Sequence, residues 1–562
     1  MRITICYLSF SVLCFLFLFS CKNSEKEKVY QQAIINSIDS IVHKDRFNND
    51  IRSAELQKVL ISFYSNRENK PVWIDSADGN KNLPQLLNFI RNSELDGLRP
   101  ETYHLNELIG LFNLFKSSNT EKKVKKMLDP KLAAKLEVQA SASYLLIASH
   151  LVYGRIEPAD STWKKQKRIF DLQNSLNQAL NNKKVLLELQ QLVPRTPEYI
   201  LLKQQLKRFR LIQKNGGWKK ILYNLNPDDR NNAIPVLRTR LELVDLLKPE
   251  LNKKVNSLYD ANVFEAVKKY QRFCGIPISG MVDDRTRKSM NIDVERRVAQ
   301  LEINLERMRW LPGERANQAI VVNLPEYLLR VYRGAKEMMN MRVIIGDEVK
   351  ATPIMRDTLQ YLVFSPTWTV PKSIMVKEML PQIKRRPNYF ETHDLEVFTS
   401  YSRNAQAIDP STINWQEIDA KNFKFRFVQR PGSENPLGLV KFMFPNKMSI
   451  YLHDSPGKYL FNSDKRTMSH GCVRIEKPFD LAMYVLSDQP KFDSTIVDSL
   501  MNLGIPKDVR INQKFEIRFT YYTAFVDNNG NLNFRPDIYH HDETQMAGVV
   551  KTSYNIGNSE KK

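Results

Sequence analysis

Hydrophobic residues recur at two different spacings along this chain, and each spacing predicts a different kind of structure. From about residue 30 to residue 220 they return every three or four positions, as they do on amphipathic helices. Residues 86–90 carry one such apolar stripe, and residues 130–153 form a long run rich in alanine and leucine. The pattern predicts a helical scaffold domain over residues 30–225.

The next unit, residues 231–291, has the pattern of three short helices. An amphipathic segment begins at Val236, a second covers residues 264–273, and a Gly-x-Val-Asp turn at residues 280–283 precedes a third. This spacing, with the sequence AVKKYQ at residues 266–271 in the second helix, resembles the small three-helix peptidoglycan-binding domain. The resemblance implies a unit that binds the cell-wall polymer.

A connecting helix is expected within residues 293–317, and after it the spacing of apolar residues changes to two. Alternating runs lie at residues 319–323, 327–332, 341–345 and 360–364. Alternation of this kind predicts β-strands, so we expect a β-rich domain over residues 318–542. The predicted fold class is therefore multidomain α+β.

An insertion interrupts the β-rich domain at residues 371–430. Its first part is helical and basic, and strand signals return only at residues 439–444. The insertion could lie over a site as a lid, or it could be a surface elaboration with no catalytic part.

The C-terminal part has the pattern of a hairpin. Residues 515–526 and 531–534 flank an Asn-Gly turn, and we expect this hairpin to complete the sheet. Residues 543–562 are expected to form a frayed tail.

The first 21 residues have the composition of an export signal. One Arg near the start is followed by an uncharged apolar run that ends in Leu-Phe-Ser-Cys, and a polar tract comes next. That ending resembles the lipobox of bacterial lipoproteins, which implies that Cys21 is lipidated and becomes the first mature residue. An uncleaved signal anchor is the alternative. In both cases we expect a periplasmic body tethered to a membrane, because no later segment is apolar enough to span one.

The net charge narrows the choice of partners. The chain has 84 Lys and Arg residues against 62 Asp and Glu residues, a formal charge of +22. This excess favours polyanionic surroundings, such as nucleic acid, anionic lipid or an acidic wall polymer, and export argues against nucleic acid. A basic run over residues 203–220 could hold an anionic polymer, but a solvated helix face is the favoured interpretation.

Candidate chemistry is concentrated in residues 451–476. Three of the five cysteines lie in the signal, and Cys274 is predicted to be a packed, inert thiol. The last, Cys472, ends a Ser-His-Gly-Cys sequence that follows His453 after fifteen residues. This economy of cysteine suggests a free thiol with a chemical role.

Strand alternation sorts the residues of this stretch into two faces. If residues 447–453 and 472–476 are strands, one set of side chains faces the core and the other faces a pocket. The core set is Met448, Ile450, Leu452, Val473 and Ile475, and the pocket set is Ser449, Tyr451, His453, Cys472, Arg474 and Glu476. Two adjacent strands would bring His453 and Cys472 together.

A Cys and a His on one face suit nucleophilic attack on an amide carbonyl. A neighbouring imidazolium can lower a thiol pKa from about 8.5, and His453 could carry a proton to a leaving amine. Backbone amides around Gly471 and Cys472 could stabilise the oxyanion. Zinc bound by His453, His470 and Cys472 is the alternative, but the chain contains neither CxxC nor HExxH, so no metal is predicted.

The same residues match the L,D-transpeptidase signature, a His followed after about fifteen residues by Ser/Thr-His-Gly-Cys, a hydrophobic residue and Arg. Longer matches to the large periplasmic branch of this YkuD-type family occur at residues 304–310, 343–346, 352–353, 368–371, 429–432, 441–446 and 451–454. Ser365 and Pro436 stand where that branch more often has Asn and Ala. The resemblance covers nearly the whole mature chain, and it equates residues 371–430 with a capping subdomain.

The resemblance implies a role for each residue of the signature. Cys472 would be the acylated nucleophile and His453 the general acid/base, oriented by the backbone carbonyl of Asp454. Gly471 would contribute to the oxyanion site through its backbone. The residues implied for substrate binding are Tyr451, Ser469, His470 and Arg474. The resemblance implies no metal or organic cofactor.

The implied activity is the formation of 3→3 crosslinks in peptidoglycan. Cys472 would attack the carbonyl before the terminal D-Ala of a tetrapeptide stem, release D-Ala, and pass the acyl group to the side-chain amine of another stem. A carbapenem would acylate the same thiol. Two alternatives remain open: an L,D-carboxypeptidase that uses water as the acceptor, and a non-catalytic wall-anchoring protein.

Overall fold

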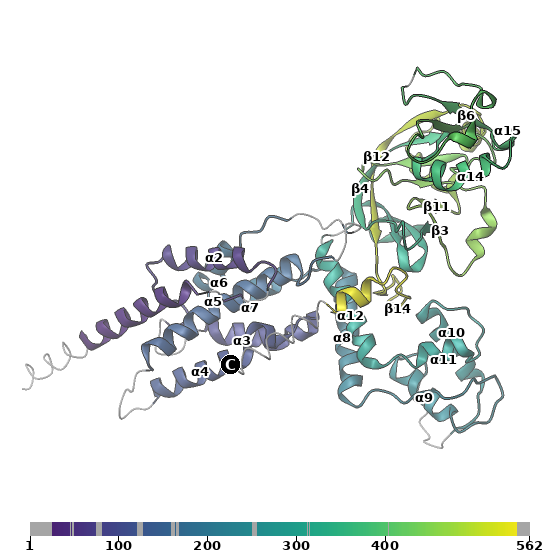
Figure 1. Ribbon diagram of the computed structural model, residues 1–562. Coiled ribbons are helices and arrows are strands. Elements are labelled where there is room, and N and C mark those ends of the chain that lie inside the picture. Colours follow the sequence, from purple (N-terminus) through teal and green to yellow (C-terminus); the bar gives the residue numbers. More distant parts are fainter. Residues whose placement is uncertain are drawn as a thin grey trace, which may run out of the picture.

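A computed structural model describes residues 25–547, except residues 45, 48–49, 75–80, 121–127, 159–162, 164–167, 250–255, 312, 314 and 403. The expected export signal, Cys21 and the last part of the expected tail lie outside the described residues. Helices make up the N-terminal part and a large sheet makes up much of the C-terminal part, so the predicted α+β fold class is confirmed (Figure 1). No described helix is both long and apolar enough to cross a membrane.

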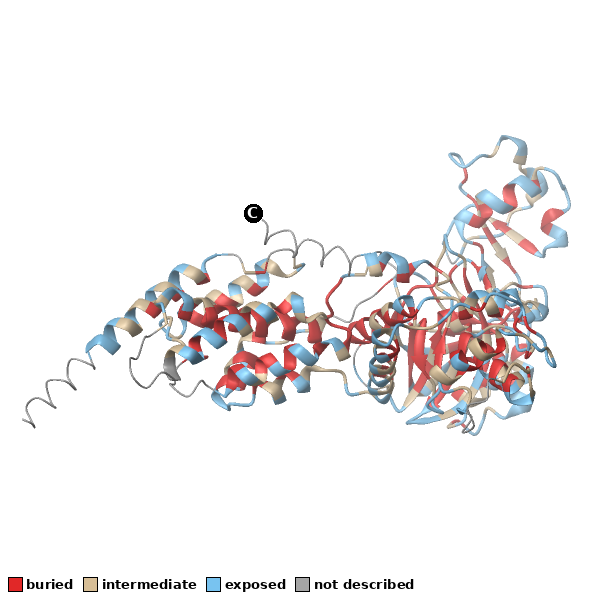
Figure 2. Cartoon of the chain, turned by 90° about the horizontal axis from the view of Figure 1, so that it is seen from below, coloured by how far each residue is buried: buried red, intermediate tan, exposed pale blue. Residues whose placement is uncertain are grey.

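The scaffold is built around one buried helix. Helix α5 (Pro130–Tyr153) begins at Asp129, whose side chain accepts hydrogen bonds from the backbone N–H groups of Lys131 and Leu132. Nearly all of its residues from 133 to 152 are buried (Figure 2). The helices that surround it are α2 (Ser53–Ser65), α3 (Asn82–Asn92), α4 (Leu105–Thr120), α6 (Leu172–Asn181) and α7 (Val185–Leu192). The continuous apolar run in the sequence is therefore a central helix covered on all sides.

The predicted three-helix unit consists of α9 (Ile234–Leu243), α10 (Ala261–Cys274) and α11 (Asp284–Met290). Gln271 on α10 is completely buried at its centre. Its side-chain oxygen accepts hydrogen bonds from the N–H groups of Ser279 and Gly280, each at 2.9 Å. Its amide nitrogen donates to the Met281 carbonyl at 2.9 Å and to Thr286 Oγ1 at 3.1 Å. One side chain thus fixes the turn between the second and third helices.

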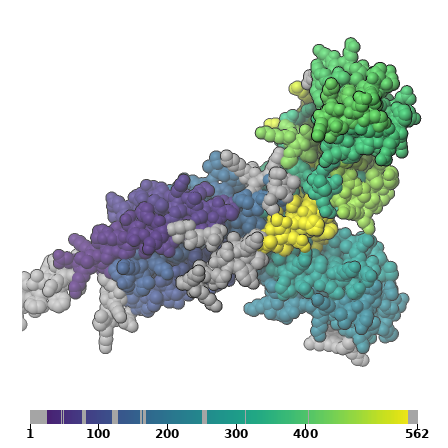
Figure 3. Space-filling view, in the orientation of Figure 1, coloured from purple at the N-terminus to yellow at the C-terminus, as the bar shows by residue number. Residues whose placement is uncertain are grey.

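Helices α8 (Pro197–Lys214) and α12 (Val294–Trp310) pack against each other where the parts of the molecule meet. In Figure 3 the C-terminal segment, in yellow, lies between the elongated helical part, the three-helix unit below it and the sheet domain above it. This junction holds the three parts together.

One nine-stranded sheet forms the core of the β-rich domain. The order of its strands is β10-β3-β11-β9-β8-β4-β12-β1-β2, and a further pairing of β2 with β3 closes the sheet on itself. The strands are β1 (Gln318–Asn323), β2 (Leu328–Arg333), β3 (Lys336–Gly346), β4 (Met355–Phe364), β8 (Val440–Met443), β9 (Leu452–His453), β10 (Thr467–Ser469), β11 (Val473–Ile475) and β12 (Lys507–Thr520). Helices α16 (Pro478–Val485) and α17 (Ser494–Met501) follow β11 and pack with this core.

The insertion at residues 371–430 builds most of a small lobe with its own apolar core. A three-stranded sheet of order β5-β7-β6 runs through the lobe. Its elements are β5 (Trp368–Thr369), α13 (Lys372–Ile374), a π-helix (Met375–Met379), α14 (Leu380–Ile383), α15 (Tyr389–Thr392), β6 (Leu395–Phe398) and β7 (Arg426–Gln429). In Figure 1 the lobe lies at the edge of the sheet domain.

The C-terminal hairpin differs from the prediction. Strand β12 belongs to the main sheet, but β13 (Ala524–Val526) and β14 (Leu532–Phe534) form a separate two-stranded sheet. The chain leaves the main sheet because Asn323 Oδ1 accepts the Tyr522 N–H at 2.8 Å and Asn304 Oδ1 accepts the Thr523 N–H at 3.0 Å. The hairpin packs instead on α8, α10 and α12.

The prediction of a frayed tail is wrong for residues 543–547. Residues 541–547 are helical, and Gln545 is buried, accepting a hydrogen bond from Arg307 Nε at 2.9 Å. A polar side chain with a buried partner holds this segment in place.

Replacing Gln271 by Ala should destabilise the three-helix unit by at least about 2 kcal/mol, because several buried polar groups would lose their partner. Calorimetric melting of the purified chain measures this as a lowered transition for the unit. Gln190→Ala, at an exposed position on α7, is the control. Equal melting curves for the two variants would show that the Gln271 network does not support the unit.

Candidate active site

Three neighbouring strands place His453, Arg474 and Lys441 on one face. His453 on β9 lies opposite Lys441 on β8 and opposite Arg474 on β11, so the three side chains form one row across the sheet. Val473 and Leu452, which point to the other face, are completely buried. Cys472 and Tyr451 precede Arg474 and His453 by two positions, which places them on the same face in the next row. The alternation expected for Cys472 to Ile475 is present.

The strand expected over residues 447–453 is shorter than predicted, because only Leu452 and His453 pair as β9. Asn446 Oδ1 accepts the N–H groups of Met448 at 3.1 Å and Ile450 at 2.9 Å, which folds the preceding residues into a loop. Ile450 is buried as expected, but Met448 is 36% exposed and does not face the core.

Cys472 is half-buried, and its thiol points towards this loop. Cys472 Sγ lies 3.6 Å from the Ser449 carbonyl oxygen, to which it donates. Tyr451 lies close enough to the thiol for each group to affect the pKa of the other. In this state the thiol proton is directed to Ser449, and His453 lies on the same face in the adjoining row.

Ser469 and Thr352 hold the turn that carries the thiol. Ser469 Oγ donates to the Cys472 carbonyl at 2.6 Å and accepts the Gly471 N–H at 3.1 Å. Thr352 Oγ1 donates to the Gly471 carbonyl at 2.7 Å. Gly471 has a φ of 116°, and a Cβ at this position would lie 3.3 Å from Ile450 Cδ1, so a side chain would strain the turn. Because Ser469 occupies the Gly471 N–H, that group is not free to bind an oxyanion in this state.

His453 is buried, and its burial and surroundings keep the imidazole neutral. Burial is the largest cause that lowers its pKa to about 3, and the Arg474 charge lowers the pKa further. The backbone carbonyls of Asp454 and Leu437 raise it in part. These two groups affect the His453 pKa, but no group in the described part of the chain meets both the distance and the angle of a hydrogen bond with His453 Nδ1. A neutral imidazole can accept a proton, as a general base must.

The Cys472 thiol is protonated as well. Burial raises its pKa, and this effect outweighs the lowering by Tyr451, Arg474 and Lys441. The expected lowering by an imidazolium is absent because the neighbouring His is neutral. The resting pair is therefore a thiol and an imidazole, not a thiolate and an imidazolium.

The Asp454 carboxylate stabilises the backbone next to the site. It accepts the Leu439 N–H at 2.9 Å and the Ser455 N–H at 2.6 Å, and it pairs with Lys458 Nζ at 2.5 Å. The sequence resemblance implied a role for the Asp454 carbonyl only, and the carboxylate is engaged in these other contacts.

His470 contacts the inserted lobe. His470 Nε2 lies 2.8 Å from Glu378 Oε1, and Lys350 Nζ lies 3.7 Å from the same oxygen. Glu378 belongs to the π-helix of the lobe. The lobe thus contacts the residue two positions before Cys472.

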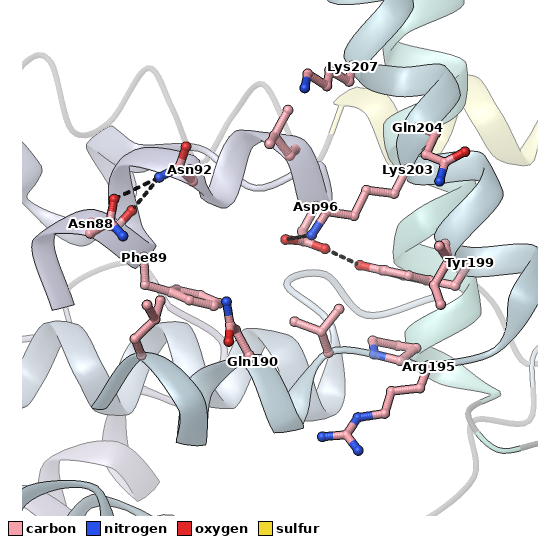
Figure 4. A pocket seen from close by; sticks show the side chains of 15 residues that line it. Asn88, Phe89, Asn92, Asp96, Gln190, Arg195, Tyr199, Lys203, Gln204 and Lys207 are labelled. Carbon is pink, nitrogen blue, oxygen red and sulfur yellow. Dashed lines mark hydrogen bonds and ion pairs between the residues drawn. The ribbon is translucent and has the colours of Figure 1, made fainter. Parts of the chain in front are cut away.

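Two cavities are notable. One, of about 380 Å³, lies beside the loop that precedes β9. Its lining includes Tyr361, Met443, Ser449 and Tyr451. A larger cleft of about 570 Å³ lies far from it, between α3, α7 and α8 of the scaffold (Figure 4). In that cleft Lys203 pairs with Asp96 at 2.7 Å, so this part of the predicted basic run is neutralised.

Comparison with known proteins identifies three segments. Residues 58–206 match a scaffold domain, residues 230–290 match a peptidoglycan-binding domain, and residues 317–497 match the L,D-transpeptidase catalytic domain. The chain carries an L,D-transpeptidase catalytic domain. The predicted resemblance is therefore confirmed.

Individual relatives were also found. A Haemophilus influenzae protein named "Putative L,D-transpeptidase" is 34% identical over 246 residues, which are 43% of this chain and 48% of that protein. The chain thus matches about half the length of this curated relative. A crystal structure of an L,D-transpeptidase from Xylanimonas cellulosilytica is 12% identical and covers 54% of this chain and 100% of its own, with a TM-score of 0.17.

Sequence reasoning missed three residues of the L,D-transpeptidase domain that touch the site. Lys441 could have been found from alternation, because Val440 and Phe442 are buried and Lys441 must face the other way. Glu378 lies in irregular helical sequence, and Thr352 is distant from Gly471 in the chain. No local pattern could have predicted those two contacts.

Alkylation of Cys472 by iodoacetamide should keep accelerating above pH 8.5, because burial raises the thiol pKa above that of an ordinary cysteine at about 8.5. Intact-mass analysis across a pH series measures the alkylation rate, and glutathione serves as the reference thiol. The Cys472→Ala variant gives the rate at Cys274, which is subtracted. A rate that already levels off near pH 7 would instead indicate a resting thiolate.

Proposed function

We propose that this protein is a cysteine L,D-transpeptidase that forms 3→3 crosslinks in peptidoglycan. The observation that carries the proposal is the half-buried thiol of Cys472 on the same face as the neutral, buried imidazole of His453, inside a catalytic domain of this family. The peptidoglycan-binding domain of the same chain supports peptidoglycan as the substrate.

The reaction follows from the protonation of the resting pair. Cys472 Sγ attacks the carbonyl carbon before the terminal D-Ala of a tetrapeptide stem while His453 takes the thiol proton. The C–N bond breaks, the imidazolium returns the proton to the leaving amine, and D-Ala departs from a thioester. The side-chain amine of a second stem then attacks the thioester, His453 takes its proton, and the thiol is restored.

The other signature residues would serve the acyl-transfer step from fixed positions. Ser469 and Gly471 form the turn that presents the thiol, and the Asp454 carbonyl lies near the imidazole. Release of the Gly471 N–H from Ser469 would provide an oxyanion donor. Tyr451 and Arg474 would contact the donor stem.

The inserted lobe would act as a lid over the donor. Support comes from Glu378, which reaches His470 from the lobe and lies near Lys350. This contact is partly exposed, so it can break and form again as the donor enters.

The protein would work in the periplasm, tethered by a lipidated Cys21 or by an uncleaved signal anchor. The binding domain would hold the polymer while the catalytic domain joins stems. The placement rests on the composition of residues 1–21 and on the peptidoglycan-binding domain.

Cys472→Ala should abolish crosslinking and prevent a carbapenem adduct, because the variant lacks the sulfur that is acylated. Incubation of the purified body with tetrapeptide muropeptides, followed by chromatography and mass analysis, measures dimers and released D-Ala. Intact mass measures the adduct. An equal carbapenem adduct on wild type and variant would contradict the assignment.

The same digest separates the alternative acceptors. Dimers with new 3→3 bonds support transpeptidation, whereas tripeptides without dimers would mean that water is the acceptor and the enzyme is an L,D-carboxypeptidase. Full retention of cellular function by Cys472→Ala would mean that the protein only anchors to the wall.

Glu378→Ala should slow acylation by a tetrapeptide donor roughly two- to fivefold, as expected from the loss of a partly exposed ion pair. Alkylation by the much smaller iodoacetamide should not slow, because it needs no lid. Glu391→Ala, an exposed change in the same lobe, is the control. Unchanged donor kinetics in Glu378→Ala would remove the lid role of this contact.

A further inference from the structure

The row across β8, β9 and β11 has an unusual order of charges. Lys441 and Arg474 are the direct register partners of His453, one on each side. Strands lie about 4.8 Å apart, so two cations flank one imidazole within a short distance. The charges of Lys441 and Arg474 both act on His453 and on Cys472.

Neither cation forms an ion pair with any residue in the described part of the chain. Lys441 Nζ lies over the Tyr451 ring, 5.6 Å from its centre, and the charge of Asp508 reaches it only from β12, two strands away. Arg474 Nε is buried without a hydrogen-bond partner in this part of the chain. Burial lowers the pKa of both side chains.

Half-buried cations without partners are unfavourable unless a ligand supplies the missing negative charge. Lys and Arg both bind carboxylates through charge-assisted hydrogen bonds. The cavity lined by Tyr451 and Ser449 adjoins the loop that the thiol contacts, and it provides space for a ligand near this row. The tetrapeptide donor of the proposed reaction is a peptide that ends in a carboxylate close to the bond that breaks.

We propose that Lys441 and Arg474 form a carboxylate-binding site on either side of His453, and that a carboxylate of the donor stem occupies it when Cys472 is acylated. The identity of the bound carboxylate rests on the proposed function, whereas the existence of a carboxylate-binding site does not. Lys441 would thereby select donors by charge, a role in specificity that the signature sequence does not include.

Occupation of the site would also strengthen the base. A carboxylate between the two cations offsets their charges, which hold down the His453 pKa together with burial. His453 then accepts the thiol proton more readily when a donor is bound than when the site is empty. Donor binding and activation of the nucleophile are coupled by this one ionic contact.

The carboxylate site can be tested without any peptidoglycan. Iodoacetate and iodoacetamide alkylate the same thiol with loss of iodide, but only iodoacetate carries a carboxylate. The ratio of their rates on Cys472, measured by intact mass, should be about tenfold higher in wild type than in Lys441→Met, as expected for one charge-assisted hydrogen bond. Lys447→Met, at an exposed position in the connection that follows β8, should keep the wild-type ratio.

The use of a ratio guards against a folding defect. A misfolded or more open Lys441→Met variant changes both rates in the same direction, whereas loss of the site lowers only the iodoacetate rate. Lys441→Arg should retain most of the preference. Equal ratios in wild type and Lys441→Met would overturn the site.

Donor peptides then identify the carboxylate. With the free tetrapeptide donor, Lys441→Met should lower kcat/KM about tenfold. One set of donors carries an amide at the terminal D-Ala, and another carries an amide at each other carboxylate of the stem. On one amidated donor, the kcat/KM of wild type should fall to that of Lys441→Met, and the substitution should cause no further loss. The carboxylate that is amidated in that donor is the one that occupies the site.

The outcomes separate the two proposals. Loss of kcat/KM by the same factor on every donor would mean that Lys441 acts only through packing or general electrostatics, and the donor assignment would be wrong. A wild type that prefers iodoacetate but processes no tetrapeptide would keep the carboxylate site and overturn the proposed function together with the donor as occupant.

Discussion

Buried charged side chains on α12 hold the parts of this molecule together. Glu306 accepts the N–H groups of Arg155 at 2.5 Å and Ile156 at 3.1 Å, where the chain leaves the scaffold. Arg309 donates to the Asp96 carbonyl at 2.7 Å, and Arg307 pairs with Asp542 near the C-terminus at 2.6 Å. Because removing one partner of a buried pair typically costs about 3–5 kcal/mol, these contacts oppose separation of the scaffold, α12 and the C-terminal segment.

The site depends on this junction through the sheet. Strand β12 pairs with β4, and β4 pairs with β8, so β12 belongs to the same sheet as the row across β8, β9 and β11. After β12 the chain continues into the C-terminal segment, which α12 holds through Arg307 and Asp542. Strand β9 has only two residues and keeps its place through the strands on either side of it. A short strand between two partners positions His453 accurately because its neighbours fix both edges.

Local patterns in the sequence predicted what depends on local spacing. The alternation of Val473 and Ile475 placed Cys472 and Arg474 on one face, and helical spacing predicted α10 and α12. Patterns could not predict that Glu306 and Arg309 are buried, since a charged residue on a helix normally faces solvent and its partners lie about 150 to 210 residues away. The hairpin was misplaced for the same reason, as Asn323 and Asn304 draw it away from the sheet. The protonation of Cys472 depends on burial, which only the assembled fold determines.

The protonated state of the resting thiol has a consequence for its reactivity towards oxidants. Peroxides and disulfides react with thiolates, and a thiol kept protonated is slow to form a sulfenic acid or a mixed disulfide. Both cysteines of the described residues are free, and Cys274 is buried in the three-helix unit, where it contacts Arg297 and not Cys472. In the proposed mechanism, deprotonation of Cys472 is left to His453 during turnover. That arrangement would also preserve the sulfur between turnovers, so that oxidants of the cell envelope would not consume the proposed nucleophile.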